Sequence, residues 1–399
     1  MPRGSSASIL LEKHDRTPRL WEGAPGFALP GNGMPIRIGF AEFDSHSMSR
    51  YRVSRFLFSL ILVVTKGAPM QVAVTDFSFP SLEVEEAILK PLGHQVVGGQ
   101  CKTPETLIPF VQDADAVITQ FAPVKADVIA AMKKARVIVR YGIGVDNVDL
   151  AAARERGIPV CNVPDYCIDE VADHTLAFLL GVTRQVVPNT LHVRAGKWGL
   201  PNPLDQMKAL RDLTVGVVGF GRIGREVVSR LAPFKCRRLV YDPATAPDVI
   251  RAAGCEPCEL NSLIQQSDVV TLHCPSTAES RRMLNVASIA SMKPGSIVIN
   301  LARGDLIETA ALVSALQSGH IAAAAIDVCD PEPIPLDSPL RQLENVIVAS
   351  HVASASVKAV WKLRETAANL AAIALRGGDL PNVVNGVNAS KSPFRSARS

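Results

Sequence analysis

Residues 213–224 have the sequence LTVGVVGFGRIG, and this stretch decides the fold of the chain. Its first half is short, apolar and rich in β-branched residues, which is typical of a strand buried on both faces of a sheet. Three glycines follow at the spacing G-x-G-x-x-G, and a helical pattern comes after them. The stretch therefore predicts a buried strand, a tight turn and a helix, in that order.

The three glycines, Gly219, Gly221 and Gly224, have separate functions in a dinucleotide site. The first allows the tight turn, the second lets the backbone approach a pyrophosphate, and the third lets the helix pack close to the sheet. The free N–H groups at the helix N-terminus then bind the pyrophosphate. The alternative is a glycine-rich turn in an α/β protein of another kind.

A carboxylate ends the next predicted strand, residues 239–241. Asp242 lies 18 residues after Gly224, where an acid can accept hydrogen bonds from both adenosine ribose hydroxyls. This favours NAD over NADP. Arg237 and Arg238 precede the strand, so we interpret them as solvated rather than as ligands of a 2′-phosphate. The alternative is that Asp242 is only a turn residue before Pro243.

From Met70 onward, short β-branched runs alternate with helical patterns, which predicts an α/β fold with parallel sheets. The first series of predicted strands is 71–75, 94–97, 116–119, 137–140 and 159–161, with helices at 82–89 and 125–132. The second series is 213–218, 239–241, 269–272, 296–300, 321–327 and 346–349. One helix, 169–187, is predicted between the two series, and a last helix at 356–375.

Composition excludes several classes of protein. The 399 residues are 47% hydrophobic with a formal net charge of +4, and no basic run interleaved with aromatic residues predicts nucleic-acid binding. Eight cysteines without a disulfide framework are typical of the reducing cytoplasm. Cys255 and Cys258 have CxxC spacing, but no second pair follows, so we predict a surface loop there and no metal site.

The termini lie outside the alternating pattern. Residues 1–69 are predicted to be an N-terminal extension that is disordered or not translated, with Met70 as the initiator. The apolar segment 56–64 is too short to span a bilayer, so no membrane association is expected. Residues 386–399 are predicted to be a disordered tail.

Polar residues follow three buried strands of the second series, at the sheet edge where parallel sheets bind ligands. Arg303 is suited to bind a carboxylate and an adjacent carbonyl oxygen, because its planar guanidinium can donate two hydrogen bonds at once. Glu332 and His351 are suited to form an acid–base pair, since a carboxylate raises the pKa of an imidazole and fixes its tautomer. The alternatives are a surface ion pair of Arg303 with Asp305, a solvated Glu332, and a structural His351.

The first series contains one further candidate, the segment RYGIGVDNVD at 140–149. Its two glycines free backbone N–H groups to bind an anion, and we expect Asp146 or Asn147 to cap the next helix. A substrate carboxylate fits this loop. A plain capped turn is the alternative.

The chain from about Met70 to Asn385 resembles the D-isomer-specific 2-hydroxyacid dehydrogenases. The matching segments are RYGIGVDNVD, VCNVPDYCIDEVADHTLAFLLGVTRQ, VGVVGFGRIGREV with YD, VTLHCPSTAES, SIVINLARGDLIE, AAAIDVCDPEP and LPNVVN. Within the family, the second segment is most similar to the C-terminal-binding-protein-like and phosphoglycerate dehydrogenase branch.

The resemblance implies a Rossmann NAD-binding domain, residues 169–351, and a flavodoxin-like substrate domain, residues 70–168 with 352–385. It implies an NAD-dependent oxidoreductase that acts on the CH–OH group of a small 2-hydroxy acid, of hydroxypyruvate, glyoxylate or phosphoglycerate type. It also implies a homodimer built partly on the helix at 169–187. The alternative is an NADH-sensing scaffold with vestigial catalysis.

The resemblance also assigns roles to single residues. His351 is the implied proton donor, Glu332 supports it, and Arg303 binds substrate. The expected NAD contacts are Gly219, Gly221, Arg222, Ile223, Gly224, Asp242, Cys274, Leu301, Arg303, Asp327 and His351, with Asp327 near the carboxamide. The expected substrate contacts are Tyr141, Gly142, Ile143 and Arg303. One departure concerns specificity: many relatives have an aromatic residue shortly after the histidine, where residues 352–356 are small or aliphatic.

Overall fold

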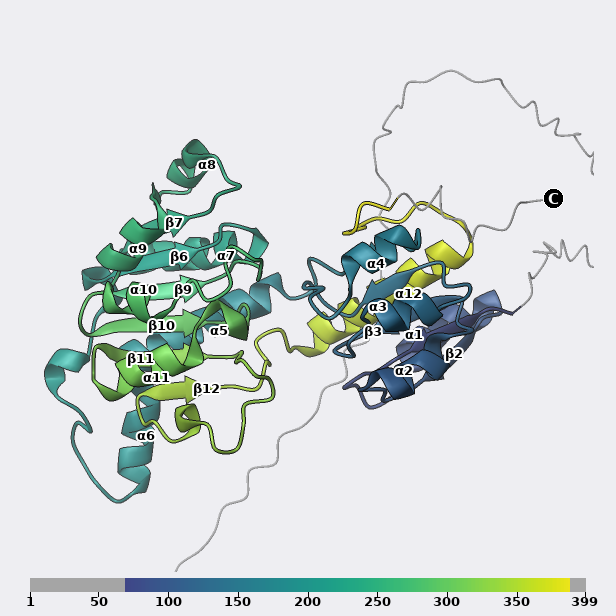
Figure 1. The fold of residues 1–399 in the computed structure, drawn as a ribbon. Coiled ribbons are helices and arrows are strands. Elements are labelled where there is room, and N and C mark those ends of the chain that lie inside the picture. The colour runs from purple at the N-terminus through teal and green to yellow at the C-terminus, as the bar shows by residue number, and fades with distance from the viewer. Residues whose placement is uncertain (1–68, 388–399) are drawn as a thin grey trace, which may run out of the picture. The chain divides into compact units, whose positions relative to one another are not determined.

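The computed structural model describes residues 69–387, which contain two parallel sheets with helices on both faces of each (Figure 1). Every strand pairing within these sheets is parallel. This confirms the predicted α/β fold. The predictions for the N-terminal extension and the C-terminal tail lie outside the described residues, apart from residues 69, 386 and 387.

The first sheet has the strand order β2-β1-β3-β4-β5, which is the flavodoxin-like order. Its strands are β1 (Gln71–Val74), β2 (Gln95–Gly98), β3 (Ala116–Thr119), β4 (Ile138–Arg140) and β5 (Val160–Cys161). Its helices are α1 (Glu83–Leu89), α2 (Pro104–Val111), α3 (Ala126–Ala131), α4 (Leu150–Glu155) and α12 (Val357–Leu375). Side chains of α1 and α12 pack on one face and those of α2, α3 and α4 on the other.

The second sheet has the order β12-β11-β10-β9-β6-β7-β8, a Rossmann sheet with one further strand at an edge. Its strands are β6 (Thr214–Val218), β7 (Arg237–Tyr241), β8 (Glu256–Pro257), β9 (Val269–Leu272), β10 (Ser296–Asn300), β11 (Ile321–Ile326) and β12 (Val346–Val348). Its helices are α5 (Ile168–Thr183), α6 (Val186–Arg194), α7 (Arg222–Leu231), α8 (Pro247–Ala252), α9 (Leu260–Gln266), α10 (Val286–Ala290) and α11 (Thr309–Gln317). Side chains of α5 and α7 cover one face of the sheet, and those of α9, α10 and α11 cover the other.

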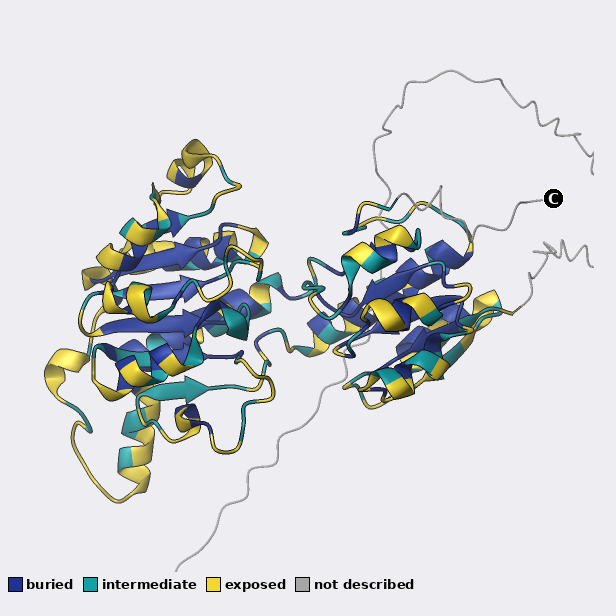
Figure 2. Ribbon diagram, in the orientation of Figure 1, coloured by how far each residue is buried: buried dark blue, intermediate teal, exposed yellow. Residues whose placement is uncertain are grey.

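The central strands of both sheets are buried on both faces, as their uninterrupted apolar sequences predict (Figure 2). Short 3₁₀ helices complete the description: η1 (Lys90–Leu92), η2 (Leu204–Gln206), η3 (Leu210–Asp212), η4 (Ala232–Phe234), η5 (Gly304–Leu306) and η6 (Pro339–Arg341). Among residues 69–387, no helix is both long and apolar enough to cross a bilayer.

Strand register brings the candidate residues to one edge of the second sheet. Val218 at the end of β6 pairs with Tyr241 on β7 and with Leu272 on β9, so the segments after these strands emerge side by side. Asn300 at the end of β10 pairs with Leu272 and with Ile326. The crossover between β6 and β9 is the switch point where such sheets bind ligands.

Two predicted elements are wrong. The single helix at 169–187 is two helices, because Gln185 adopts a left-handed conformation (φ 52°) between α5 and α6. Pro188 explains the break, since its ring would collide with the carbonyl of Arg184 in a continuous helix. The predicted loop at Cys255 and Cys258 is instead interrupted by the edge strand β8.

Candidate active site

The glycine turn after β6 has the geometry of a dinucleotide site. Gly219 has φ +98°, and a Cβ there would lie 2.6 Å from the carbonyl carbon of His273. A Cβ on Gly224 would collide with the carbonyl oxygen of Gly219, so helix and turn are in close contact. Gly221, which precedes α7, faces open space. Because the first N–H groups of a helix have no intrahelical partner, Arg222 and Ile223 present theirs to this space.

Asp242 is fixed to the glycine turn. Its carboxylate accepts hydrogen bonds from the backbone N–H of Phe220 (2.6 Å) and of Ala244 (2.9 Å). Each oxygen keeps further acceptor capacity for a ribose hydroxyl. Burial raises the pKa of the Cys274 thiol to about 11, and the negative charge of Asp242 makes a smaller contribution in the same direction.

Arg237 and Arg238 are engaged away from this site. They lie within β7, which begins two residues earlier than predicted. Arg237 forms an ion pair with Glu256 (2.7 Å), and Arg238 donates to the carbonyl of Gly254 (2.9 Å). The carboxylate at the end of β7 is therefore available to accept hydrogen bonds from an adenosine ribose, and these residues fit NAD.

Two further expected NAD contacts are mostly buried. Leu301 belongs to the hydrophobic core, so mainly its backbone is available. Asp327 accepts hydrogen bonds from the N–H groups of Val352 (2.8 Å) and Ala353 (2.9 Å), and its carbonyl accepts one from the N–H of His351 (2.7 Å). Asp327 thus fixes the loop that carries His351.

Arg303 contacts the loop that follows β4. Its Nε donates to Asp146 (2.6 Å), and its Nη1 donates to the carbonyl of Ala302 (2.7 Å). Burial acts to raise the pKa of Asp146, but the charge and hydrogen bond of Arg303 outweigh it, so this pKa is below its ordinary value. Asp305 instead pairs with Arg281 (3.2 Å), which removes the surface ion pair proposed as an alternative for Arg303.

Both glycines of the RYGIGVDNVD segment make room for an arginine. A Cβ on Gly142, which has φ +148°, would collide with the guanidinium of Arg140, and a Cβ on Gly144 would collide with that of Arg303. The backbone N–H of Gly142 donates to the carbonyl of Arg140 (2.9 Å). The backbone N–H groups of the next two residues, Ile143 and Gly144, have no acceptor among the described residues. The free donors of this loop therefore include the N–H groups of residues 143 and 144.

The other residues of this segment have structural contacts. Tyr141 is fully buried, and its hydroxyl donates to the buried carboxylate of Glu85 (2.8 Å), so its side chain is directed into the core. The predicted caps of α4 are wrong: Asp149 accepts from the N–H groups at its N-terminus, while Asn147 donates to the carbonyl of Ala122 (2.9 Å). A cap must lie directly before the helix, and α4 begins only at Leu150.

Glu332 and His351 form the expected pair. Nδ1 of His351 lies 2.7 Å from Oε1 of Glu332, and Nε2 has no partner among the described residues. Burial acts to raise the pKa of Glu332, but its hydrogen bond and its Coulombic attraction to His351 outweigh it, so this pKa is lowered. His351 itself has a left-handed backbone (φ 57°), an uncommon conformation that the Asp327 contacts hold in place.

Three residues that the sequence did not identify are connected with His351 through the loop after β3. The ring of Phe121, in the loop after β3, has its centroid 6.0 Å from that of His351, and the guanidinium of Arg140 lies 5.9 Å from the same ring. Asp76 fixes the loop by accepting from the N–H of Phe121 (2.6 Å). Asp76 and Arg140 are polar residues at strand ends and were identifiable by that signal, whereas Phe121 gives no signal in the sequence.

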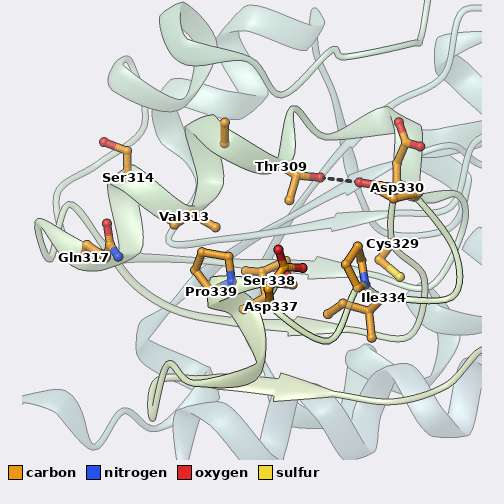
Figure 3. Close-up of a pocket in the computed structure, with 14 residues that line it drawn as sticks. Thr309, Val313, Ser314, Gln317, Cys329, Asp330, Ile334, Asp337, Ser338 and Pro339 are labelled. Carbon is orange, nitrogen blue, oxygen red and sulfur yellow. Dashed lines mark hydrogen bonds between the residues drawn. The ribbon is translucent and has the colours of Figure 1, made fainter.

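A separate cavity of about 490 Å³ lies between α11 and the segment 329–340 (Figure 3). The hydroxyl of Thr309 donates to the carbonyl of Asp330 (3.0 Å), as the dashed line shows. Arg303, His351 and Asp242 do not line this cavity. It contacts the segment that carries Glu332 without being part of the candidate active site.

Comparisons with known proteins agree with this geometry. The family model described as "D-isomer specific 2-hydroxyacid dehydrogenase, NAD binding domain" matches residues 176–353. The chain is 38% identical over 286 residues to a glyoxylate reductase of Korarchaeum cryptofilum, covering 70% of this chain and 86% of that protein. It is 36% identical over 308 residues to a D-3-phosphoglycerate dehydrogenase of Mycobacterium leprae, covering 76% of this chain but only 57% of that protein.

Solved structures share the fold. The TT0316 protein of Thermus thermophilus has a TM-score of 0.72 and 36% identity, covering 79% of this chain and all of that one. A D-lactate dehydrogenase of Aquifex aeolicus, in complex with NAD and lactic acid, has a TM-score of 0.71 and 26% identity, covering 77% and 96%. The chain therefore belongs to the D-isomer specific 2-hydroxyacid dehydrogenase family.

Proposed function

We propose that this chain reversibly transfers a hydride between NAD(H) and C2 of a small 2-oxo or 2-hydroxy acid, with Arg303, Glu332 and His351 as its catalytic residues. The observation that carries the assignment of residues is the 2.7 Å contact between Glu332 and His351, at the sheet edge that also carries Arg303. The named relatives with assigned activities are enzymes, so they give the scaffold alternative no support.

The nicotinamide, when bound, supplies or accepts the hydride. In the reducing direction, protonated His351 donates the Nε2 proton to the substrate oxygen, because Nδ1 is occupied by Glu332. Arg303 and the N–H groups of Ile143 and Gly144 hold the substrate carboxylate, and Arg303 also stabilises charge on the reacting oxygen. Oxidation uses the same groups in reverse, with His351 as the base.

The direct test is NADH oxidation by the full chain across a panel of 2-oxo acids that includes glyoxylate and hydroxypyruvate. Turnover of any member with NADH supports the proposed activity. Tight NADH binding without turnover of any member contradicts it and favours the scaffold.

Asp242 is expected to set the cofactor preference. In Asp242→Asn the kcat/KM ratio of NADH over NADPH falls by about tenfold or more, because the charge that repels a 2′-phosphate is lost while an oxygen acceptor for Phe220 remains. Initial rates with the two cofactors measure this ratio. Asp248→Asn, on the exposed surface of α8, is the matched control, and an equal change in both variants contradicts the assignment.

Glu332 is expected to set the pH dependence of reduction. In Glu332→Gln, the alkaline limb of kcat/KM for the 2-oxo acid moves to lower pH, because an amide does not stabilise the imidazolium that must donate the proton. A pH–rate profile measures the shift. An unshifted limb with a merely lower plateau means that Glu332 acts only in packing.

Assembly as a homodimer is part of the proposal, with the interface on α6 and the segment after it rather than on α5. Most apolar residues of α5 are buried within the chain. By contrast, α6 and the segment after it expose apolar side chains: Val186, Val187, Leu191, Val193, Trp198, Leu200 and Leu204. Such a patch is typical of an interface. Sedimentation equilibrium of the wild type and of Trp198→Glu tests it, and a monomeric wild type contradicts it.

Domain organisation and location complete the proposal. We place the NAD-binding domain at residues 169–351 and the substrate domain at 70–168 with 352–385, supported by the packing of α12 against the first sheet. All eight cysteines have free thiols, which supports a location in the reducing cytoplasm. Limited proteolysis and cell fractionation test these two points.

A further inference from the structure

Arg140, the last residue of β4, carries a buried positive charge without an acceptor. The residue is 9% exposed, and its side chain makes no hydrogen bond to any of residues 69–387; Nε is fully enclosed and unpartnered. A buried guanidinium normally pairs with a carboxylate or with several carbonyls. The five N–H donors of Arg140 therefore lack the partner that such a group requires.

The nearby carboxylates do not fill this role. Asp146 is held by Arg303 at 2.6 Å, and Asp76 accepts three backbone N–H groups, those of residues 120–122. Burial, followed by repulsion from Arg303, lowers the pKa of Arg140 to about 10, so the group is still charged at neutral pH. A further anion is needed to compensate this charge.

Arg140 lies beside the candidate active site. Its guanidinium occupies the space beside Gly142 that a side chain would fill, in the loop whose next two N–H groups are free. The ring of Phe121, 53% exposed, lies within 6.0 Å of both this guanidinium and the His351 ring. Phe121 thus connects the proposed proton donor with the unpaired cation.

We propose that Arg140 binds a second anionic group of the substrate, a carboxylate or a phosphate attached beyond C2. The enzyme therefore selects 2-oxo acids with two anionic groups (dianionic substrates) over those with one (monoanionic substrates). This rests on the proposed function, in which Arg303 holds the first carboxylate. Phe121 forms the wall along which the chain between the two anionic groups runs. Glyoxylate, with a single anionic group and no further carbon, leaves Arg140 unpaired.

The test compares matched pairs that differ in the second charge: oxaloacetate against 2-oxobutyrate, and phosphohydroxypyruvate against hydroxypyruvate. With saturating NADH, the wild type is expected to prefer the dianion of at least one pair, which also shows whether the subsite takes carboxylate or phosphate. In Arg140→Met the kcat/KM for that dianion falls by about 100-fold, mainly because KM rises. The kcat/KM for its monoanionic partner changes by less than about threefold. Arg211→Met, an exposed arginine of η3, is the control.

Two results overturn the inference: a wild type without preference for either dianion, or an equal loss for both members of the preferred pair in Arg140→Met. The second result means that Arg140 holds the common carboxylate or only supports the loop. Arg140→Lys, which keeps the charge, is expected to restore part of the preference. Unchanged NADH affinity and melting temperature show that the variants are folded.

A binding measurement separates this inference from the proposed activity. Calorimetry on the NADH-loaded wild type compares D-malate with D-2-hydroxybutyrate, which form no product with the reduced cofactor. Tighter binding of D-malate that is lost in Arg140→Met supports the second anion subsite even without turnover. Equal binding of both acids overturns it even where turnover is observed.

Discussion

Replacement of His351 by asparagine is expected to lower kcat for 2-oxo acid reduction by about 10³-fold, equivalent to about 4 kcal/mol of transition-state stabilisation. Asparagine removes the proton that Nε2 donates but tolerates the left-handed backbone at this position (φ 57°) better than most residues do. The loop is held by Asp327 through backbone groups, which the substitution leaves intact. The result is measured as kcat at saturating NADH and substrate.

The discriminating control is cofactor affinity. In the proposed function the glycine turn and Asp242 hold NADH, so its dissociation constant is expected to change little in His351→Asn. His320→Asn, which alters a histidine bonded to the carbonyl of Ile289, should retain wild-type turnover. A His351→Asn enzyme with near wild-type kcat would show that another group donates the proton.

The alternation of apolar runs and helices was sufficient to predict both parallel sheets. The predicted strands at 116–119, 269–272 and 296–300 coincide with β3, β9 and β10, because these segments are buried on both faces and their sequences are uninterrupted. The edge strand β8 was missed because Glu256 and Pro257 carry no such pattern. The break between α5 and α6 depends on Pro188, which the amphipathic pattern concealed.

The candidate site was predictable where chemistry and strand ends coincide, at Arg303, Glu332 and His351. The contributions of the first sheet were not. From the sequence, Gly142 and Gly144 were interpreted as residues that leave backbone N–H groups free to bind an anion. In the structure, each glycine also leaves space for the guanidinium of an arginine. An aromatic ring nevertheless lies beside His351, that of Phe121, which comes from a loop 230 positions earlier in the chain. Such proximity depends on tertiary packing, which no local pattern encodes.

Replacement of Arg303 by methionine is expected to lower kcat/KM for every 2-oxo acid by about 10³-fold, through both a lower kcat and a higher KM. Both constants change because the same guanidinium holds the substrate carboxylate and stabilises charge on the reacting oxygen. This uniform loss distinguishes Arg303 from Arg140, whose replacement affects only substrates with a second anionic group. Arg303→Lys should recover only a small part of the lost kcat/KM, because an ammonium group lacks the planar pair of hydrogen-bond donors of a guanidinium.

The matched control is Arg281→Met, which removes another arginine paired with a carboxylate, Asp305, from the segment between β9 and α10. Methionine at 303 also frees Asp146, which repels an anionic substrate, so the double variant Arg303→Met, Asp146→Asn should bind substrate better than Arg303→Met alone. Its kcat should remain low, because the donor to the reacting oxygen is still missing. If the double variant regained wild-type kcat, Arg303 would serve only to neutralise Asp146, and the charge on the oxygen would be stabilised by other groups.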